Sequence, residues 1–175
     1  SNMIYAALAG LDAWTDAGLV RPTPGGDEVD WDTGACIGTG IGGMDTIADR
    51  LVDPVRQGRV RRLGSTLVEQ IMASGVSARL SGFLGLGNWV STNSSACTTG
   101  TEAIVTSLRT IRAGYARRML AGGSEGCSPF IWAGFDAFRV LMRKSNDAPA
   151  RASLPMSTGV GGFVTPGDTV DIVLT

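Results

Sequence analysis

The stretch from Asn93 to Gly100, N-S-S-A-C-T-T-G, places Cys97 between an apolar segment and a helix-like run that continues to Arg112. At a helix N-terminus, unpaired backbone N–H groups and the helix dipole favour an anion. For cysteine that anion is the thiolate, its nucleophilic form, and the same N–H groups can stabilise an oxyanion. The pattern therefore predicts nucleophilic catalysis. A buried structural cysteine is the alternative, because free cysteine is common in protein cores.

Few other groups suited to acid–base or metal chemistry accompany this cysteine. The 175 residues include no histidine, and the only lysine is Lys144. The three cysteines, Cys36, Cys97 and Cys127, contain no C-x-x-C pair, which argues against a zinc site or a disulfide framework. We therefore expect no metal and no cofactor. An imidazole base, if the reaction needs one, must come from another chain or from sequence outside these residues.

Composition narrows the class of protein. A net charge of −1 and 43% hydrophobic residues are typical of a globular domain and do not indicate a nucleic-acid-binding protein. No apolar run approaches the ~20 residues that span a bilayer, and no segment has the build of a secretion signal. These features predict a single domain over residues 1–175, without a membrane span and located in the cytoplasm.

A glycine motif, G-T-G-I-G-G at residues 38–43, follows a short predicted strand at 35–37. Its spacing matches the dinucleotide-binding fingerprint. That fingerprint also requires an acidic residue about twenty positions later, where this chain instead has Arg59, Arg61 and Arg62. A tightly packed turn is the preferred interpretation. A nucleotide-binding α/β domain remains an alternative.

The spacing of apolar residues predicts an α/β unit in which helices flank a mixed sheet. Trp132, Phe135 and Phe138 form an aromatic stripe within 130–141, and such stripes usually face the core. Helices are expected at 4–17, at 45–53 up to Pro54, at 66–80 after a capping box at Thr66, and from Cys97 to Arg112 with Gly114 as C-cap. Strands are expected at 35–37, at 88–92 after a turn at 82–87, and at 119–121, closed by Gly122-Gly123.

Three strings resemble the beta-ketoacyl-acyl carrier protein synthases of the thiolase-like superfamily. They are W-V-S-T-N-S-S-A-C-T-T-G-T-E-A-I, I-R-A-G-Y-A-R-R-M-L-A-G-G-S-E and A-G-F-D-A-F-R-V-L, in that order along the chain. The resemblance covers nearly all 175 residues but corresponds to the N-terminal half of a synthase, without its first strand and its C-terminal half. It weakens after Ser153, where Leu154 replaces the family's arginine and a glutamate of the tail is missing.

The resemblance implies the N-terminal part of a thiolase-like αβαβα fold. It also implies that Cys97 accepts an acyl group from a carrier-protein thioester. The acyl-enzyme then undergoes a decarboxylative Claisen condensation with malonyl-acyl carrier protein, in fatty acid or polyketide or polyene biosynthesis. In the family, two histidines of the C-terminal half assist decarboxylation, and a backbone N–H there completes the oxyanion hole. A non-catalytic fragment or partner subunit of a ketosynthase is the alternative.

Other residues acquire roles from the same resemblance. Glu125 corresponds to a structural, hydrogen-bonding residue near the subunit interface. The strand at 88–92 corresponds to the homodimer interface. A half-synthase exposes unpaired strand edges and apolar faces, so we expect oligomers or poor solubility. The acidic acyl carrier protein would dock on Arg59, Arg61 and Arg62, although a solvated basic face explains such a run equally simply.

Overall fold

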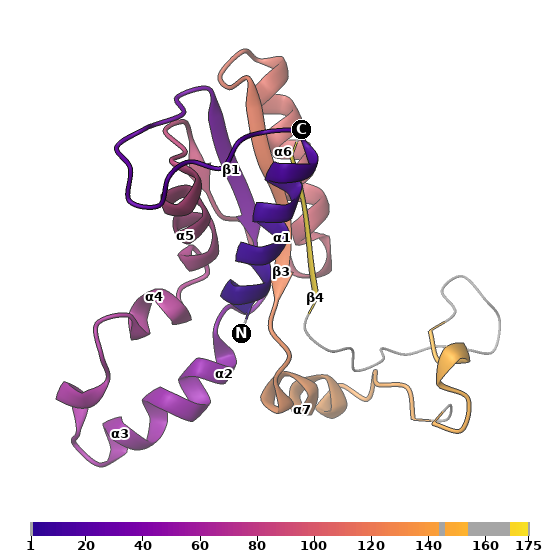
Figure 1. The fold of residues 1–175 in the computed structure, drawn as a ribbon. Helices are drawn as coiled ribbons and strands as arrows, with labels where there is room; N and C mark the ends of the chain where they lie inside the picture. The colour runs from indigo at the N-terminus through magenta and orange to yellow at the C-terminus, as the bar shows by residue number, and fades with distance from the viewer. Residues whose placement is uncertain (1, 144–145, 154–168, 175) are drawn as a thin grey trace.

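The computed structural model of the chain describes residues 2–143, 146–153 and 169–174. It contains a four-stranded sheet with strand order β2-β1-β3-β4 (Figure 1). β1 pairs in parallel with both β2 and β3, whereas β3 and β4 are antiparallel, so the predicted mixed sheet is confirmed. The strands are β1 (Thr33–Gly38), β2 (Val90–Ser91), β3 (Arg118–Glu125) and β4 (Thr169–Leu174).

Helices lie on both faces of this sheet. They are α1 (Asn2–Asp16), α2 (Met44–Thr46), α3 (Val52–Arg56), α4 (Leu67–Ile71), α5 (Gly75–Leu84), α6 (Thr99–Arg112) and α7 (Pro129–Ala137). A π turn, η1 (Ile47–Leu51), and three 3-10 turns, η2 (Val60–Arg62), η3 (Ala96–Thr98) and η4 (Pro149–Arg151), complete the described elements. α1 and α5 cover one face of the sheet and α6 covers the other (Figure 1).

Alternation of side chains along β1 builds two cores. Ala35 and Ile37 belong to the core beneath α1 and α5, while Cys36 belongs to the core beneath α6. Neighbouring residues of a strand point to opposite faces, so one strand supplies both layers. In β3, Leu120 belongs to the core beneath α1 and α5, and Met119 belongs to the core beneath α6. The result is one helix–sheet–helix set, as expected for half of the layers of a thiolase-like fold.

Two predicted helices are confirmed, with their C-terminal ends; they begin at Asn2 and Thr99 instead of residue 4 and Cys97, because Cys97 lies in the 3-10 turn before the second helix. The helix expected at 4–17 is α1, and Gly18 follows it with φ +74°. The helix expected to end near Gly114 is α6, and Gly114 has φ +77°. Both glycines adopt the left-handed conformation of a helix C-cap, which side chains disfavour.

The helix predicted to stop at Pro54 instead continues past it, so that prediction is wrong. α2, η1 and α3 form a continuous helical path from Met44 to Arg56. Pro54 lies in the first turn of α3, directly after the π turn. A proline is tolerated in a first turn because its missing N–H group is not required there.

The single helix predicted at 66–80 is also wrong, because it divides into α4 and α5. Met72 between them is extended, with ψ 137°, and Thr66 makes no side-chain capping hydrogen bond. The chain bends where backbone packs on backbone: a Cβ at Gly75 would lie 2.2 Å from the Glu69 carbonyl oxygen. The predicted helix is interrupted because the backbone of Gly75 packs against the backbone of Glu69, which outweighs the helix propensity of the segment. α5 then extends through the predicted turn at Gly82, so β2 is shorter than expected.

Gly122 and Gly123 were expected to end a strand, but β3 continues through them to Glu125. Pairing with β1 on one side and β4 on the other overrides the weak strand preference of glycine. The absence of a side chain at Gly123 also lets α6 approach. A Cβ at Gly123 would lie 3.3 Å from the Cα of Gly100.

The aromatic stripe was expected to be core, and this too is corrected. α7 contains no fully buried residue; of the stripe, Trp132 and Phe135 are half-buried and Phe138 is 77% exposed. The helix leaves the end of β3 and lies beyond the edge of the sheet, where neither core reaches it (Figure 1). The segment at 154–168, where the resemblance weakens, lies outside the described residues, as does Lys144.

Candidate active site

The carboxyl-terminal ends of three parallel strands meet at one edge of the sheet. They are Gly38 of β1, Ser91 of β2 and Glu125 of β3. Open α/β sheets bind ligands at this kind of edge. Cys97 lies here in η3, between the end of β2 and the first residue of α6.

Cys97 is an exposed free thiol. The alternative of a buried structural cysteine fits Cys36 instead, which is 1% exposed in the core beneath α6. Burial raises the pKa of the Cys36 thiol, the negative charge of Glu102 adds to the rise, and a hydrogen bond with Ser91 opposes it. Cys36 therefore stays protonated, and Cys97 is the cysteine that a substrate can reach.

The residue before Cys97 has an unusual backbone. Ala96 adopts φ +52°, in the left-handed region where a side chain costs about 1–2 kcal/mol. Two hydrogen bonds of the Thr99 hydroxyl compensate: it accepts from the Ser95 N–H at 2.8 Å and donates to the Ala96 carbonyl at 2.6 Å. The turn that carries Cys97 is thus held in a strained conformation.

Asn93 links this turn to its surroundings. Its Nδ2 donates to the Thr99 carbonyl at 2.9 Å and to Glu102 Oε2 at 3.3 Å. Its Oδ1 accepts from the Cys36 thiol at 3.9 Å. Hydrogen bonds from Ser95 and Asn93 lower the pKa of Glu102, which is exposed on the first turn of α6.

Sequence reasoning missed the roles of Asn93 and Thr99. The available signal was the number of short polar side chains around A-C, because asparagine, serine and threonine readily bond to nearby backbone groups. Which of these polar side chains bond to the turn, and which face solvent, depends on how β1 and α6 pack around them.

The glycine motif is occupied by the protein's own carboxylate. Glu125 Oε1 accepts from the Gly40 N–H at 2.8 Å and from the Thr39 hydroxyl, and Thr39 Oγ1 accepts from the Gly42 N–H at 3.1 Å. A Cβ at Gly40 would lie 2.8 Å from Glu125 Oε2. The loop donors are therefore not free for a pyrophosphate. The geometry does not support the nucleotide-binding alternative.

The same loop brings Glu125 and Cys97 to one site. The Ser94 hydroxyl donates to the Gly40 carbonyl at 3.3 Å, which joins the segment before Cys97 to the loop that binds Glu125. Glu125 is half-buried and bonded on its Oε1 by that loop, so it lies beside the turn that carries Cys97.

The three arginines lie apart from this site. Arg59, Arg61 and Arg62 are exposed on and beside η2, between α3 and α4. Figure 1 shows this arm leaving the same edge of the sheet as α7. Among the described residues, none of these three side chains forms an ion pair. Their positive charge is exposed to solvent.

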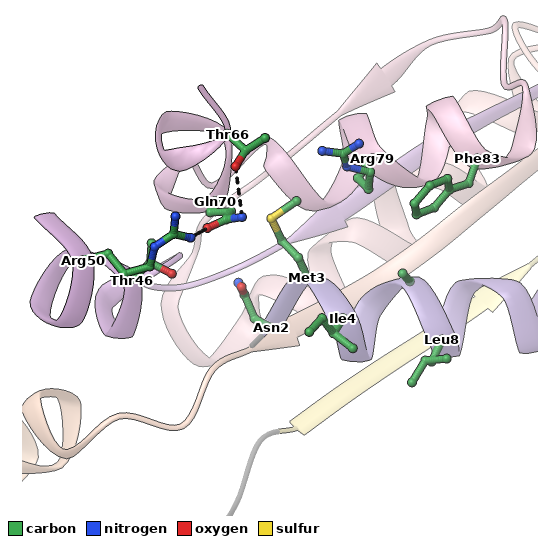
Figure 2. A pocket seen from close by; sticks show the side chains of 11 residues that line it. Asn2, Met3, Ile4, Leu8, Thr46, Arg50, Thr66, Gln70, Arg79 and Phe83 are labelled. Atoms are coloured by element: carbon green, nitrogen blue, oxygen red, sulfur yellow. Dashed lines mark hydrogen bonds between the residues drawn. The ribbon is translucent and has the colours of Figure 1, made fainter. Parts of the chain in front are cut away.

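A cavity of about 540 Å³ lies between α1, α4, α5 and the segment of α2 and η1 (Figure 2). Met3, Ile4 and Phe83 contribute apolar surface, and two arginines contribute charge. Both cations are already engaged, because Arg50 donates to Gln70 and Arg79 pairs with Glu69. None of the predicted site residues lines this cavity. Within the described ranges, no group of three His, Cys, Asp or Glu side chains is placed to hold a metal ion.

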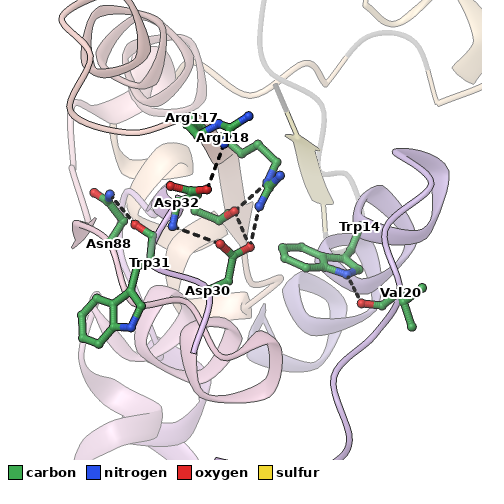
Figure 3. Close-up of polar contacts among 9 residues, drawn as sticks. Trp14, Val20, Asp30, Trp31, Asp32, Asn88, Arg117 and Arg118 are labelled. Carbon is green, nitrogen blue, oxygen red and sulfur yellow. Dashed lines mark hydrogen bonds and ion pairs between the residues drawn. The ribbon is translucent and has the colours of Figure 1, made fainter. Parts of the chain in front are cut away.

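A polar cluster fixes the opposite edge of the sheet (Figure 3). Asp30 accepts from the Thr33 hydroxyl at 2.7 Å, from the Arg118 guanidinium at 2.9 Å and from the Asp32 N–H at 3.0 Å. Burial on its own raises the pKa of Asp30, but these hydrogen bonds and the Arg118 charge together hold it below its ordinary value. The cluster joins the start of β1 to the start of β3.

The fold and the site define a class: a thiolase-like α/β protein with an exposed cysteine at the start of a helix on the carboxyl edge of its sheet. More particularly, the chain belongs to the beta-ketoacyl synthase family. The sequence model of that family's N-terminal domain matches residues 3–168.

Individual relatives agree with this assignment. The chain is 36% identical to 3-oxoacyl-acyl-carrier-protein synthase 2 of Synechocystis sp., over 91% of this chain and 37% of the relative. It is 36% identical to the protein of the same name from Vibrio harveyi, over 97% of this chain and 40% of the relative. The chain therefore spans about two fifths of the length of the curated relatives it matches.

Solved structures show the same fold. A beta-ketoacyl synthase from Burkholderia phymatum superposes with a TM-score of 0.83 at 27% identity, over 99% of this chain and 41% of that one. A type II polyketide ketosynthase, solved in complex with its acyl-carrier protein and bound to the hexaketide, gives a TM-score of 0.84 at 25% identity, over 99% and 43%. In the described part of our chain, no helix has the length and apolar character needed to cross a membrane.

Proposed function

We propose that Cys97 is the nucleophile of a beta-ketoacyl synthase. The observation that carries this proposal is the exposed Cys97 thiol at the start of α6, on the carboxyl edge of the sheet. Family membership supports it, because the curated relatives are named 3-oxoacyl-acyl-carrier-protein synthases. The pathway would be fatty acid or polyketide biosynthesis.

The reaction would proceed in two steps. The Cys97 thiolate attacks the carbonyl of an acyl-carrier-protein thioester, and the carrier thiol leaves. The enzyme-bound acyl group is then attacked by the carbanion that malonyl-acyl carrier protein yields on losing carbon dioxide. The new carbon–carbon bond releases Cys97 and extends the chain by one two-carbon unit. In each step the backbone N–H of Cys97 is the candidate donor to the oxyanion.

Intact mass spectrometry tests the first step. The chain would be incubated with an acyl-carrier-protein thioester beside C97A, with C127S as the matched control. We expect an acyl adduct on the parent and on C127S and none on C97A, because only Cys97 stands at a helix N-terminus with its thiol exposed. An adduct on C97A contradicts the proposal, and no adduct on the parent favours the non-catalytic fragment or partner subunit.

The second step should fail in this chain alone. The 175 residues contain no histidine, and Cys97 has no imidazole partner for decarboxylation. Adding malonyl-acyl carrier protein to the acylated chain should give no beta-ketoacyl product by mass spectrometry. Condensation by the isolated chain would show that its own residues supply the missing acid–base groups.

We propose that Arg59, Arg61 and Arg62 dock the acidic carrier protein. Their exposure and lack of ion pairs among the described residues support this, as does the solved relative in complex with its acyl-carrier protein. Docking of opposite charges steers association and weakens with salt.

Charge reversal tests the docking surface. The triple variant R59E/R61E/R62E should lower the rate of Cys97 acylation by the carrier thioester roughly tenfold at low salt, because steering raises on-rates by 10 to 10³. Acylation by a small-molecule thioester should not change. R112E, at the far end of α6, is the control and should behave as the parent. Equal losses with both substrates would contradict docking at these arginines.

We also propose that the protein is a homodimer, or pairs with a ketosynthase partner chain, through the outer edge of β2. Among the described residues β2 pairs only with β1, and Trp89 beside it is 46% exposed. A free strand edge next to an exposed aromatic is suited to pairing between chains.

A cytoplasmic location is our proposal for the cell. None of the three cysteines, all of which lie in the described residues, forms a disulfide, which suits a reducing compartment. One relative, a synthase of Schizosaccharomyces pombe, is named as mitochondrial. Imaging of a fluorescent fusion in the native host would decide between the two compartments.

A further inference from the structure

We propose that Thr99 is a positioning residue of this site: its hydroxyl sets the direction of the Cys97 backbone N–H. The inference rests on the proposed role of Cys97 as nucleophile and goes beyond it, because it names the group that orients the oxyanion donor. The evidence is the geometry of the turn from Ser95 to Thr99.

The Thr99 hydroxyl donates to the Ala96 carbonyl oxygen at 2.6 Å. That carbonyl and the Cys97 N–H belong to the same peptide unit, which is planar and trans. Fixing the direction of the carbonyl therefore fixes the direction of the N–H on the other side of the plane. The Thr99 backbone N–H also donates to this carbonyl, so two hydrogen bonds from Thr99 hold the peptide unit whose N–H would face a thioester oxygen.

The same hydroxyl also binds the chain before Ala96. Its oxygen accepts from the Ser95 N–H at 2.8 Å, so Thr99 binds the Ser94–Ser95 peptide unit as well as the Ala96–Cys97 unit, and the strained residue, whose φ is +52°, lies between them. Rotation of either unit breaks one of these bonds. Without the hydroxyl, Ala96 can relax to an ordinary conformation, and the Cys97 N–H then turns away.

Thr99 is itself fixed by elements outside the turn. It is 5% exposed, and its carbonyl accepts from Asn93 Nδ2 at 2.9 Å. Its methyl group lies against β1, where a Cβ at Gly38 would be 2.1 Å from Thr99 Cγ2. The neighbouring Thr98 differs: it is exposed, and its hydroxyl donates to the Ser95 carbonyl at 2.8 Å, which is not part of the Cys97 peptide unit.

The test compares two reactions of the same thiol. Acyl transfer from a carrier-protein thioester passes through an oxyanion, whereas alkylation by iodoacetamide needs only a reachable thiolate. T99V keeps the size and the methyl packing but removes the hydroxyl, and T99S keeps the hydroxyl. T110V is the matched control, because it removes a threonine hydroxyl that donates to a backbone carbonyl, that of Thr106, far along α6.

We expect T99V to slow acylation roughly tenfold to a hundredfold, the lower part of the range for loss of an oxyanion donor. Alkylation should change less than about twofold, because the thiol stays exposed. T99S and T110V should acylate at close to the parent rate. Acylation by T99V at the parent rate, an equal fall in both reactions, or no rescue by T99S would overturn the proposal.

Failure of the proposed function is distinguishable from failure of this inference. If the parent alkylates but forms no acyl adduct, Cys97 is not an acyl carrier, and hydrogen exchange of the Ser95 amide decides on Thr99. If the Thr99 hydroxyl holds the turn, the Ser95 amide should exchange faster in T99V and at the parent rate in T99S. Equal exchange in both variants would remove the positioning role.

Discussion

Gly38, the last residue of β1, has no space for a side chain. A Cβ there would lie 2.1 Å from Thr99 Cγ2 and 2.7 Å from the Asn93 carbonyl oxygen, and the second neighbour is backbone that cannot rotate away. We expect G38A to lower the free energy of unfolding by about 1–3 kcal/mol, the usual cost of overpacking. Because it pushes on Thr99, G38A should also slow acylation of Cys97.

Gly82 is the matched control for this prediction. It lies exposed within α5, and a Cβ there meets no atom within 4 Å. G82A should raise the free energy of unfolding by about 0.5–1 kcal/mol, because alanine favours a helix over glycine. Urea unfolding of both variants and the parent measures the difference. Equal stabilities of G38A and G82A would contradict the packing seen at Gly38.

Among the elements, β1 and β3 are joined at their first residues by Asp30 and Arg118 (Figure 3). Arg118 Nε also donates to Thr33 Oγ1 at 2.8 Å, so the guanidinium binds both partners. The carboxylate is about three quarters buried, with a side-chain exposure of 25%. Such a bonded carboxylate favours the folded state only while it is ionised.

This contact makes stability depend on pH. The pKa of Asp30 in the folded protein lies below its ordinary value of 3.8, so its contribution to stability is complete above that value and is lost as pH falls below it. We expect the free energy of unfolding to drop between neutral and acidic pH, and to drop less in D30N. D27N, in the exposed loop before β1, is the control. An acid slope in D30N equal to that of D27N would contradict this assignment.

Glu125 makes the corresponding link at the carboxyl-terminal ends of the strands. It joins the end of β3 to the loop between β1 and α2, through the Thr39 hydroxyl and the Gly40 N–H. A hydrogen-bonded carboxylate thus links β1 and β3 at each end of the pair. Glu125, at the carboxyl-terminal ends of the strands, lies next to the turn of Cys97, where the proposed chemistry requires a rigid backbone.

For the whole molecule, apolar surface is left uncovered on two helices among the described residues. Ile104 and Leu108 of α6 are 41% and 42% exposed, and Phe130 and Phe138 lie exposed at α7. Exposed patches of this kind drive association. The chain covers about two fifths of its curated relatives, so these faces are where we expect further protein to pack.

We therefore predict that the isolated chain associates in solution. Light scattering after size exclusion should give a mass above 18.1 kDa. W89K should weaken the proposed β2-edge dimer, and F130S/F138S should reduce larger species, because each removes exposed aromatic surface. Y115S, which also removes an exposed aromatic, is the control. A monodisperse monomer of the parent would contradict both interfaces.

The sequence by itself determined the features that depend on short stretches of chain. Apolar spacing and a following glycine were enough for α1 and for the end of α6. The motifs around Cys97 were enough for the family, since N-S-S-A-C-T-T-G and its neighbours resemble it directly. These signals are local, because helix caps and strand alternation act within a few residues.

Only the tertiary structure decided the features that join distant residues. Glu125 occupies the glycine loop from 85 positions away, which removed the nucleotide-binding reading of a motif that matches letter for letter. α7 contains no fully buried residue although its sequence is that of a core helix. Thr99 gains its role only because β1 ends in Gly38 beside it. In each case a contact in space outweighs a preference of about 1 kcal/mol or less per residue, and no local pattern encodes which distant residue supplies that contact.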